Sequence, residues 1–357
     1  MSTPLAEKIR WLIEADGPMS VAAYMAHCLG DPEHGYYATR DPFGAAGDFV
    51  TAPEVSQMFG EIVGAWLVHV WGLAGGPSPV RLVELGPGRG TLMADILRVS
   101  ARRPDFTAAI SVHLVETSPV LRAKQAATLA ASGHRADWHD SFSDVPPGPV
   151  LLVANEFFDA LPIRQFIRIK GRWRERVIGL EGASRLSFGL GPGILDQRRE
   201  APAGAILEVS PAREGLTADL ARRIAAEGGA ALIVDYGYTQ GGPGETLQAV
   251  RGHAFADPLA TPGEADLTAH VDFAALAASA AGAGAAVHGP VTQSRFLVSL
   301  GLLDRAGRLV AAADEVTREA IRTAVERLTG PDQMGELFNV LAITTPGLTP
   351  PPFGPCI

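Results

Sequence analysis

The chain has 357 residues, of which 47% are hydrophobic and 19% charged, so it can bury a large core in one or two domains. Its formal net charge of −9 argues against general nucleic-acid binding, because that binding relies on Lys and Arg to neutralise phosphates. The two cysteines, Cys28 and Cys356, lie far apart and outside any metal-ligand spacing. The sequence therefore predicts neither a disulfide framework nor a metal site, and it favours a reducing compartment.

The N-terminal part predicts a helical region with a glycine-rich loop over residues 1–75. Residues 5–14 and 20–29 have the patterns of two helices, and a segment rich in Gly, Pro and aromatic residues follows them. Thr51-Ala52-Pro53-Glu54 is typical of a capping box, which predicts one helix continuing to Val70. The first 18 residues lack the apolar core of a signal peptide, and no run is apolar and long enough to cross a bilayer. We expect a soluble cytoplasmic protein without membrane insertion.

The stretch VELGPGRGT, residues 83–91, predicts a ligand-binding turn between a buried strand and a helix. Gly86, Gly88 and Gly90 let the backbone approach a ligand closely, and the helix that follows offers free N–H groups. The third glycine comes one residue earlier than in the dinucleotide pattern GxGxxG. Glu84 could hold an ammonium group but would repel a pyrophosphate, so ExGxGxG favours S-adenosylmethionine (SAM) over a nicotinamide cofactor. A glycine-rich turn without a ligand is the structural alternative.

Glu116 provides a second predicted contact with the cofactor. Residues 110–116 predict the next strand, and a carboxylate at its end can accept hydrogen bonds from both ribose hydroxyls. The alternative is that Glu116 caps the helix that begins near Ser118, although Ser118 could serve as that cap instead. Together the two contacts favour SAM.

The rest of the chain predicts an α/β fold in which strands and helices alternate, so the sheet is mostly parallel. Residues 164–209 differ, because apolar and polar residues alternate on both sides of Lys170-Gly171, which indicates an antiparallel insertion. We expect a Rossmann-like domain over residues 76–345, with helices on both faces of its sheet, and an irregular tail over 346–357. The further elements are expected at residues 120–131, 136–139, 150–154, 216–226, 231–235, 273–280, 286–288, 294–328 and 338–345.

The segment NEFFDALP, residues 155–162, is the strongest candidate for the catalytic segment, because it follows an apolar strand at the edge where ligands bind. Methyl transfer from a sulfonium is an in-line displacement, so the enzyme mainly aligns the acceptor and manages its proton. Asn155 and Glu156 could orient a nitrogen, and a carboxylate suits a guanidinium. In the structural alternative, Asn155 or Asp159 caps a helix and the two phenylalanines belong to the core.

Three further positions are weaker candidates. Asp48 follows a run of small residues that could form a loop closing over the cofactor, although it also suits a turn. Asp235 ends a predicted strand and either lines the substrate pocket or terminates the strand. The segment His270-Val271-Asp272 could offer a base, but Asp272 also suits a helix N-cap and a lone His is often structural, so the structural interpretation is favoured there.

Several long segments, in order, resemble the mitochondrial complex I assembly-factor methyltransferase family and its bacterial relatives. The likeness spans roughly residues 20–345 and is carried by GDFVTAPEVSQMFGE, VELGPGRGTLMADILR, NEFFDALP, VDYGY and RGHAFADPLATPGEADLTAHVDF. The resemblance implies a class I SAM-dependent methyltransferase fold. It also implies arginine methylation of a protein, since the mitochondrial members are regarded as acting on a core subunit of complex I.

The resemblance assigns the cofactor loop to Glu84, Gly86, Gly88 and Gly90 and the ribose contact to Glu116. Asp48, Asn155 and Glu156 fall in family motifs and are the catalytic candidates. The chain lacks an evident transit peptide, unlike the mitochondrial members, which favours a bacterial protein. Three alternatives stay open: a SAM-binding assembly factor without turnover, a small-molecule methyltransferase, and a nicotinamide-dependent oxidoreductase, which the glycine spacing disfavours.

Overall fold

The computed structural model describes residues 3–39, 50–182, 184–196 and 200–353. Contacts between residues divide the chain into two compact units. The first unit comprises residues 1–49, 159–215 and 240–270, and the second comprises residues 50–158, 216–239 and 271–357. The division expected from the sequence, with boundaries near residues 75 and 345, stays a prediction. None of the helices in the described ranges is both long enough and apolar enough to cross a membrane.

The second unit is built on a mixed, mostly parallel sheet. Seven of its strands follow the order β15-β16-β10-β5-β2-β3-β4, and the short strand β14 pairs with β10. The five strands from β10 to β4 are parallel neighbours, whereas β16 is antiparallel to both β10 and β15. The bounds in sheet order are β15 Ala286–Thr292, β16 Phe338–Thr344, β10 Gly229–Tyr238, β5 Val150–Asn155, β2 Val80–Leu85, β3 Ile110–Val115 and β4 Ala136–His139, with β14 at Val271–Asp272.

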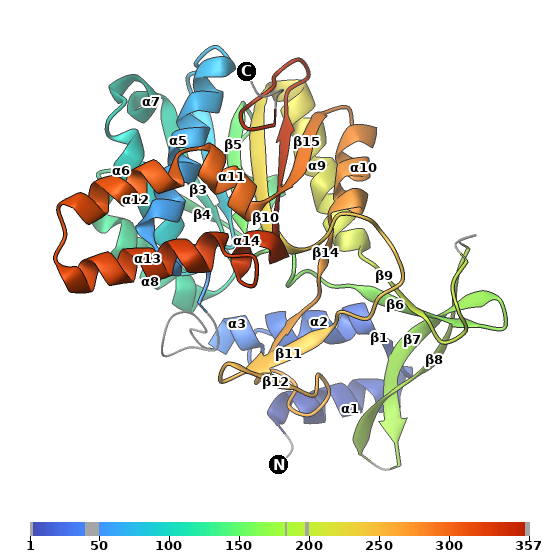
Figure 1. Cartoon of the computed structure of the whole chain (residues 1–357). Helices are drawn as coiled ribbons and strands as arrows, with labels where there is room; N and C mark the ends of the chain where they lie inside the picture. The colour runs from blue at the N-terminus through green and yellow to red at the C-terminus, as the bar shows by residue number, and fades with distance from the viewer. Residues whose placement is uncertain (1–2, 40–49, 183, 197–199, 354–357) are drawn as a thin grey trace. The chain divides into compact units, whose positions relative to one another are not determined.

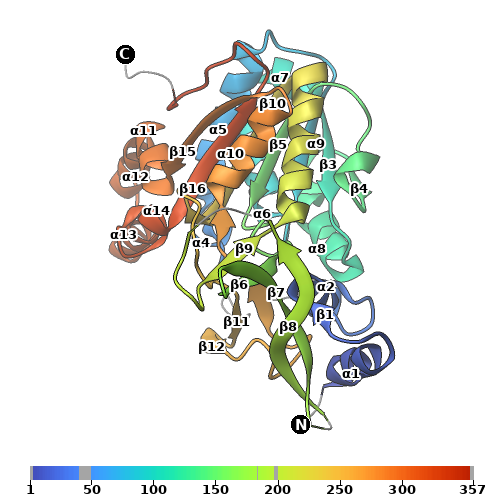
Figure 2. The same cartoon turned by 90° about the vertical axis from the view of Figure 1, so that its right-hand side faces the viewer.

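Helices cover both faces of this sheet, as Figures 1 and 2 show. Helices α5 and α6 lie on one face and α9 and α10 on the other. Strand β5 is apolar from Val150 to Ala154 and buried at every residue, as expected for a parallel strand with both faces covered. The α/β fold expected from the sequence is therefore confirmed. The helices are α4 Ala52–Val55, α5 Gln57–Leu73, α6 Thr91–Ser100, α7 Pro104–Ala109, α8 Pro119–Leu129, α9 Pro211–Glu227 and α10 Phe273–Gly282, with short 3₁₀ helices at Ala130–Ser132 and Phe142–Asp144.

The prediction of a single helix from Thr51 to Val70 is wrong, because the helix is interrupted at Ser56. This residue is extended, with φ −163° and ψ 136°, and its hydroxyl accepts the Met58 N–H at 3.2 Å to begin α5. The Thr51 hydroxyl makes no capping hydrogen bond to the described residues of α4. The expected capping box fails because the Glu54 carboxylate contacts Thr91 of α6 instead of turning back to Thr51.

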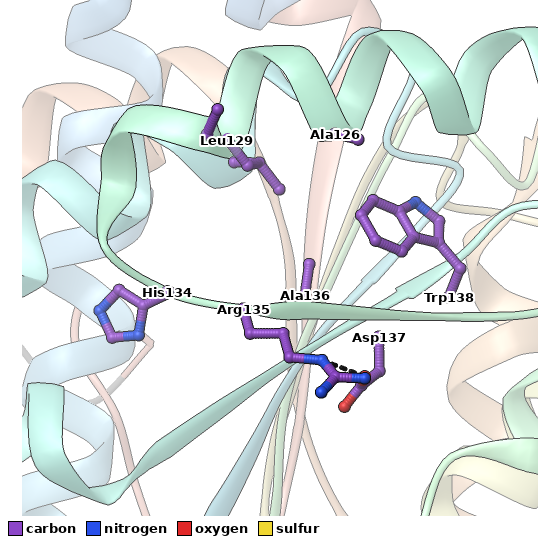
Figure 3. Close-up of a pocket in the computed structure, with 8 residues that line it drawn as sticks. Ala126, Leu129, His134, Arg135, Ala136, Asp137 and Trp138 are labelled. Carbon is purple, nitrogen blue, oxygen red and sulfur yellow. Dashed lines mark ion pairs between the residues drawn. The ribbon is translucent and has the colours of Figure 1, made fainter.

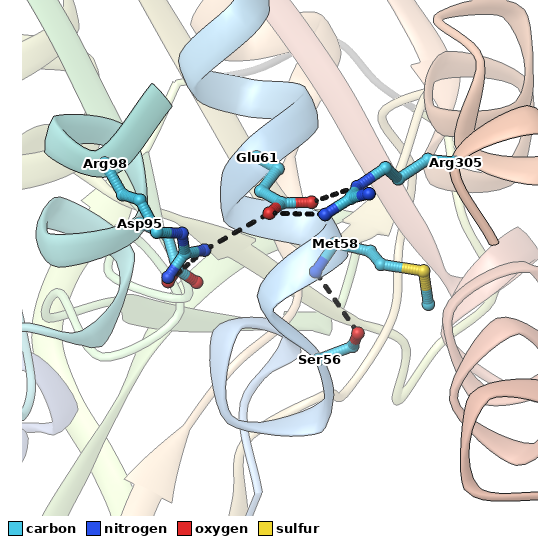
Figure 4. Close-up of polar contacts among 6 residues, drawn as sticks. All are labelled: Ser56, Met58, Glu61, Asp95, Arg98 and Arg305. Carbon is cyan, nitrogen blue, oxygen red and sulfur yellow. Dashed lines mark hydrogen bonds and ion pairs between the residues drawn. The ribbon is translucent and has the colours of Figure 1, made fainter. Parts of the chain in front are cut away.

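Four helices between β15 and β16 extend the second unit: α11 Gln293–Ser299, α12 Leu302–Ala311, α13 Glu315–Thr329 and α14 Met334–Leu337. Glu61 of α5 links this group to the face that carries α6 (Figure 4). Its carboxylate accepts two hydrogen bonds from Arg305, at 2.7 and 3.0 Å, and forms an ion pair with Arg98 at 3.4 Å. Arg98 also pairs with Asp95 at 2.9 Å. A continuous network of charges therefore joins α12, α5 and α6.

The first unit combines short helices with antiparallel strands. Strands β6 Arg164–Ile169 and β7 Arg172–Glu181 form the hairpin expected at Lys170-Gly171, and β8 Arg185–Leu195 pairs with β7 in a long twisted extension (Figure 2). The antiparallel insertion expected over residues 164–209 is therefore confirmed. The other elements are α1 Pro4–Asp16, β1 Met19–Ser20, α2 Val21–Gly30, α3 Tyr36–Thr39, β9 Ile206–Val209, β11 Gln248–Arg251, β12 Ala254–Ala256 and β13 Asp266–Thr268.

Candidate functional site

The glycine turn connects β2 to α6 at the carboxyl end of the parallel strands. Gly86, Gly88 and Gly90 all have positive φ, at 60°, 54° and 83°. A side chain would be strained at each position, and a Cβ at Gly86 would lie 2.6 Å from the ring of Phe157. The Gly90 N–H bonds the Pro87 carbonyl at 2.8 Å, which closes the turn tightly against the start of α6. The turn thus requires these glycines for its own geometry.

Glu84 is buried beneath this turn and serves as a cap for α6. Gly90, at the N-cap position, has no side chain, and the Glu84 carboxylate accepts the Met93 N–H in the first turn of the helix. Its second oxygen, Oε2, is buried without a hydrogen-bond partner among the described residues. Burial, with a smaller contribution from the nearby Asp95 carboxylate, raises the pKa of Glu84 to about 8. One oxygen of this carboxyl is therefore still available to a buried cation.

Glu54, on the short helix α4, is a contact with the turn that the sequence analysis missed. Its Oε1 accepts a hydrogen bond from the Thr91 hydroxyl at 2.6 Å, and its Oε2 lies 3.9 Å from Arg89. Thr91 is the first residue of α6 and Arg89 lies inside the glycine turn. Glu54 therefore anchors the turn to the segment that precedes α5.

Glu116 directly follows β3 and is buried, as expected for a carboxylate at a strand end. Its Oε1 accepts the Ser118 N–H at 2.8 Å, and its Oε2 accepts the side-chain amide of Gln125 at 3.1 Å. Ser118 caps α8 with its own hydroxyl, so the capping alternative for Glu116 is not needed. Burial raises the pKa of Glu116, and the N–H groups of Ser118 and Gln125 oppose that shift.

Asn155 and Glu156 lie at the end of β5, which is the neighbour of β2 in the sheet. The Asn155 amide donates to Glu156 Oε1 at 3.1 Å, while the buried Oδ1 of Asn155 has no partner in the described part of the chain. Glu156 has φ 50°, an uncommon conformation for a residue with a side chain, and its Oε1 also accepts the Ala52 N–H at 2.9 Å. Glu156 thus fixes both Asn155 and the start of α4.

The remaining candidates have structural partners. Asp235 lies inside β10, not at its end, and its Oδ2 accepts the Phe158 N–H at 2.9 Å. Asp272 is the N-cap of α10 and accepts the Ala275 N–H, as the structural alternative expected. Asp159 and His270 belong to the first unit, where Asp159 accepts the Ala160 N–H and burial lowers the pKa of His270. Asp48 lies outside the described residues.

A shallow hollow of about 370 Å³ lies between the end of α8 and β4 (Figure 3). Leu129, Ala136 and Trp138 form part of its wall, and Arg135 pairs with Asp137 at its margin. The glycines of the turn and Asn155 are not among the residues that line it. This hollow is therefore distinct from the cluster at the strand ends.

The residues brought together at the ends of β2, β3 and β5 are Glu84, the three glycines, Glu116, Asn155 and Glu156. A sheet in this order, with a glycine turn after β2 and an acid after the neighbouring strand β3, has the arrangement expected of a SAM-dependent methyltransferase. The comparisons with known proteins agree. Residues 62–291 match the family model Methyltransf_28, described as "Putative S-adenosyl-L-methionine-dependent methyltransferase".

The chain belongs to the family of the NDUFAF7 and COG1565 proteins. It is 41% identical to the Drosophila melanogaster protein named "Protein arginine methyltransferase NDUFAF7 homolog, mitochondrial", with 95% of this chain and 84% of that protein covered. The human protein arginine methyltransferase NDUFAF7 is 37% identical, with 96% and 83% covered. A COG1565 member from Burkholderia thailandensis, crystallised with S-adenosyl-homocysteine, has a TM-score of 0.83 at 29% identity, with 97% and 92% covered.

Proposed function

We propose that the cluster at the ends of β2, β3 and β5 binds SAM. The unpartnered Oε2 of Glu84 suits the ammonium group of the methionine portion, and the glycine turn leaves room for that portion above it. Glu116 suits the two ribose hydroxyls, because its carboxylate lies at the end of the neighbouring strand. The crystal structure of the Burkholderia relative with S-adenosyl-homocysteine supports the same cofactor.

Asn155 is the proposed catalytic group. When bound, SAM supplies an electrophilic methyl group, which moves in line from sulfur to an acceptor nitrogen and leaves S-adenosylhomocysteine. The buried, unpartnered Oδ1 of Asn155 can accept a hydrogen bond from the acceptor N–H and direct its lone pair. Glu156 holds the Asn155 amide, so that Oδ1 keeps its direction. Methylation leaves an extra proton on the acceptor, which is lost to solvent or to a base.

The acceptor that we propose is an arginine side chain in a protein, with a subunit of respiratory complex I as the first target to test. The single observation that carries this proposal is the identity of 37–41% with relatives named protein arginine methyltransferases, over nearly the whole chain. Asp48, which the sequence analysis included among the catalytic candidates, remains a candidate on the sequence alone.

The test is transfer of a labelled methyl group from SAM to complex I subunits and to a cell extract, followed by mass spectrometry of the labelled peptides. We expect the label on arginine, and we expect Asn155→Leu to lower turnover at least tenfold with S-adenosylhomocysteine affinity retained. Gln293→Leu is the matched control, because Gln293 is another buried amide with an unpartnered oxygen in the described region, on α11.

Each alternative gives a different result in this experiment. Label on a small molecule would favour a small-molecule methyltransferase. Binding of SAM without transfer to any partner would favour an assembly factor that holds its partner without turnover. Full turnover by Asn155→Leu would remove Asn155 from the catalytic role.

A further inference from the structure

Gln125 is a buried polar residue on the apolar side of a helix. It lies in α8 between Leu121 and Leu129, four residues from each, and all three side chains are buried. Gln125 itself is 0% exposed. A buried amide is costly unless its donors and acceptor are all satisfied, so its partners indicate why it is there.

Three hydrogen bonds satisfy the side chain of Gln125. The amide nitrogen, Nε2, donates to the Gly88 carbonyl at 2.9 Å and to Glu116 Oε2 at 3.1 Å. The amide oxygen accepts from the indole N–H of Trp138 on β4 at 2.8 Å. Because Trp138 can only donate, it fixes the orientation of the amide and directs both Nε2 hydrogens to Gly88 and Glu116.

Gln125 therefore connects the two parts of the cofactor site. It holds the glycine turn through Gly88 and the strand-end carboxylate through Glu116. The turn also packs closely on the same helix, since a Cβ on Gly90 would lie 3.3 Å from the Gln125 Cα. The amide N–H opposes the rise in the Glu116 pKa that burial causes, and so favours the ionised carboxylate.

We propose that Gln125 is a positioning residue that makes Glu116 competent to recognise the ribose hydroxyls of the cofactor. The proposal rests on the cofactor role of Glu116 given above. Ser118 donates to one oxygen of the Glu116 carboxylate and Gln125 to the other, which holds the carboxylate in one orientation, and carboxylate oxygens can accept further hydrogen bonds from the ribose hydroxyls. Only an amide supplies both the donors to Gly88 and Glu116 and the acceptor for Trp138.

The experiment measures ribose recognition by calorimetric titration with S-adenosylhomocysteine and its 2′-deoxy analogue. The readout is the ratio of the two dissociation constants, which reports the 2′-hydroxyl contact alone. We expect the ratio to be at least tenfold in the wild type and to approach one in Glu116→Ala. Gln125→Met removes the donors at similar size, and Gln125→Glu places a carboxylate against Glu116. We expect both to lower the ratio at least fivefold.

A lower stability alone does not change this ratio, because it affects both ligands equally. Gln293→Met is the matched control, since Gln293 is a buried amide on α11 whose nitrogen donates to the Leu328 carbonyl, and we expect its ratio to stay within twofold of the wild type. If Glu116→Ala collapses the ratio while both Gln125 variants keep it, the inference is wrong and the cofactor site stands. If Glu116→Ala also keeps the ratio, the ribose role of Glu116 fails and the inference with it.

Discussion

Replacing Glu84 by Gln should stabilise the ligand-free protein and weaken its binding of the cofactor. Burial raises the pKa of Glu84 to about 8, so the folded protein favours the neutral carboxylic acid. Gln resembles that neutral form in size and keeps an oxygen for the Met93 N–H. It cannot balance the charge of an ammonium group, so SAM and S-adenosylhomocysteine should lose affinity.

The magnitude follows from the difference between the folded pKa of about 8 and the unfolded value of 4.5. Between these values the folded state binds more protons than the unfolded state, so stability falls as pH rises. Each pH unit in this range lowers the free energy of unfolding by about 1.4 kcal/mol. Relative to a pH below 4.5, the loss is roughly 3 kcal/mol at pH 7. Between pH 5 and pH 8 it is roughly 4 kcal/mol. This loss is complete once the pH exceeds the folded pKa.

The assay is urea unfolding of wild type and Glu84→Gln at pH 5 and pH 8, followed by tryptophan fluorescence. We expect the free energy of unfolding of the wild type to fall between these pH values by several kcal/mol more than that of the variant. The raised pKa of Asp95, about 6, contributes to both proteins and largely cancels in the comparison. Calorimetry with S-adenosylhomocysteine should show at least a tenfold loss of affinity in the variant.

A wild-type titration provides a second check. Because Glu84 is mostly protonated near pH 7 in the free protein, pairing with the ligand ammonium should release close to one proton. Calorimetry at pH 7 in buffers of different ionisation enthalpy measures that release. Equal pH dependence of stability in both proteins, together with no proton release, would refute the reasoning.

Two further substitutions test the turn and the helix cap. Gly86→Ala should lower S-adenosylhomocysteine affinity and cost about 1–2 kcal/mol of stability, because φ is 60° and the new methyl would displace Phe157. Gly72→Ala is the control for titration and thermal unfolding, because an added Cβ would meet no described atom within 4 Å beyond its chain neighbours and the backbone of its own helix α5, and equal effects of the two would argue against the turn geometry. Asp272→Ala should cost about 1 kcal/mol through loss of the α10 cap, with affinity and turnover unchanged, and a loss of turnover measured by labelled methyl transfer would restore Asp272 as a chemical candidate.

The fold was largely predictable because its signals are local. Apolar runs of strand length mark the buried parallel strands, and the glycine spacing marks the turn after β2. The hairpin at Lys170-Gly171 was predictable for the same reason, since Lys170 and Gly171 both adopt positive φ. The order of the strands and the antiparallel direction of β16 depend on contacts between distant segments, and the residue pattern alone does not encode them.

The break between α4 and α5 shows where local rules compete. Thr51 and Ser56 are both residue types that favour the N-cap position. The Ser56 hydroxyl accepts the Met58 N–H, whereas the Glu54 carboxylate accepts a hydrogen bond from Thr91 on another helix. That tertiary contact overrides the capping box. The end of strand β10 was predicted too early, at Asp235, for a similar reason. Pairing with β16 continues β10 as far as Tyr236, and β14 pairs with the next two residues, Gly237 and Tyr238.

The residues of the candidate site were largely predictable from the sequence, but the hydrogen bonds that join them were not. Their positions at strand ends mark Glu84, Glu116 and Asn155 as candidates in the sequence. Gln125 was missed, although a signal existed: an amide spaced four residues from Leu121 and from Leu129 lies on the buried side of its helix. A polar residue in such a position requires partners, and those partners cannot be named without the fold.

The position of β16 inside the sheet has a consequence for synthesis of the chain. The proposed cofactor residues all lie within the first 156 residues, but among the strands of the described ranges β15 pairs only with β16, whose last residue is Thr344. Until that strand is made, the nascent polypeptide exposes the edge of β10 and leaves β15 unpaired, and such edges invite aggregation. The sheet is therefore completed only after the strands that carry the proposed cofactor residues have been synthesised, and a premature stop before Phe338 removes the strand between β10 and β15 even though the glycine turn is intact.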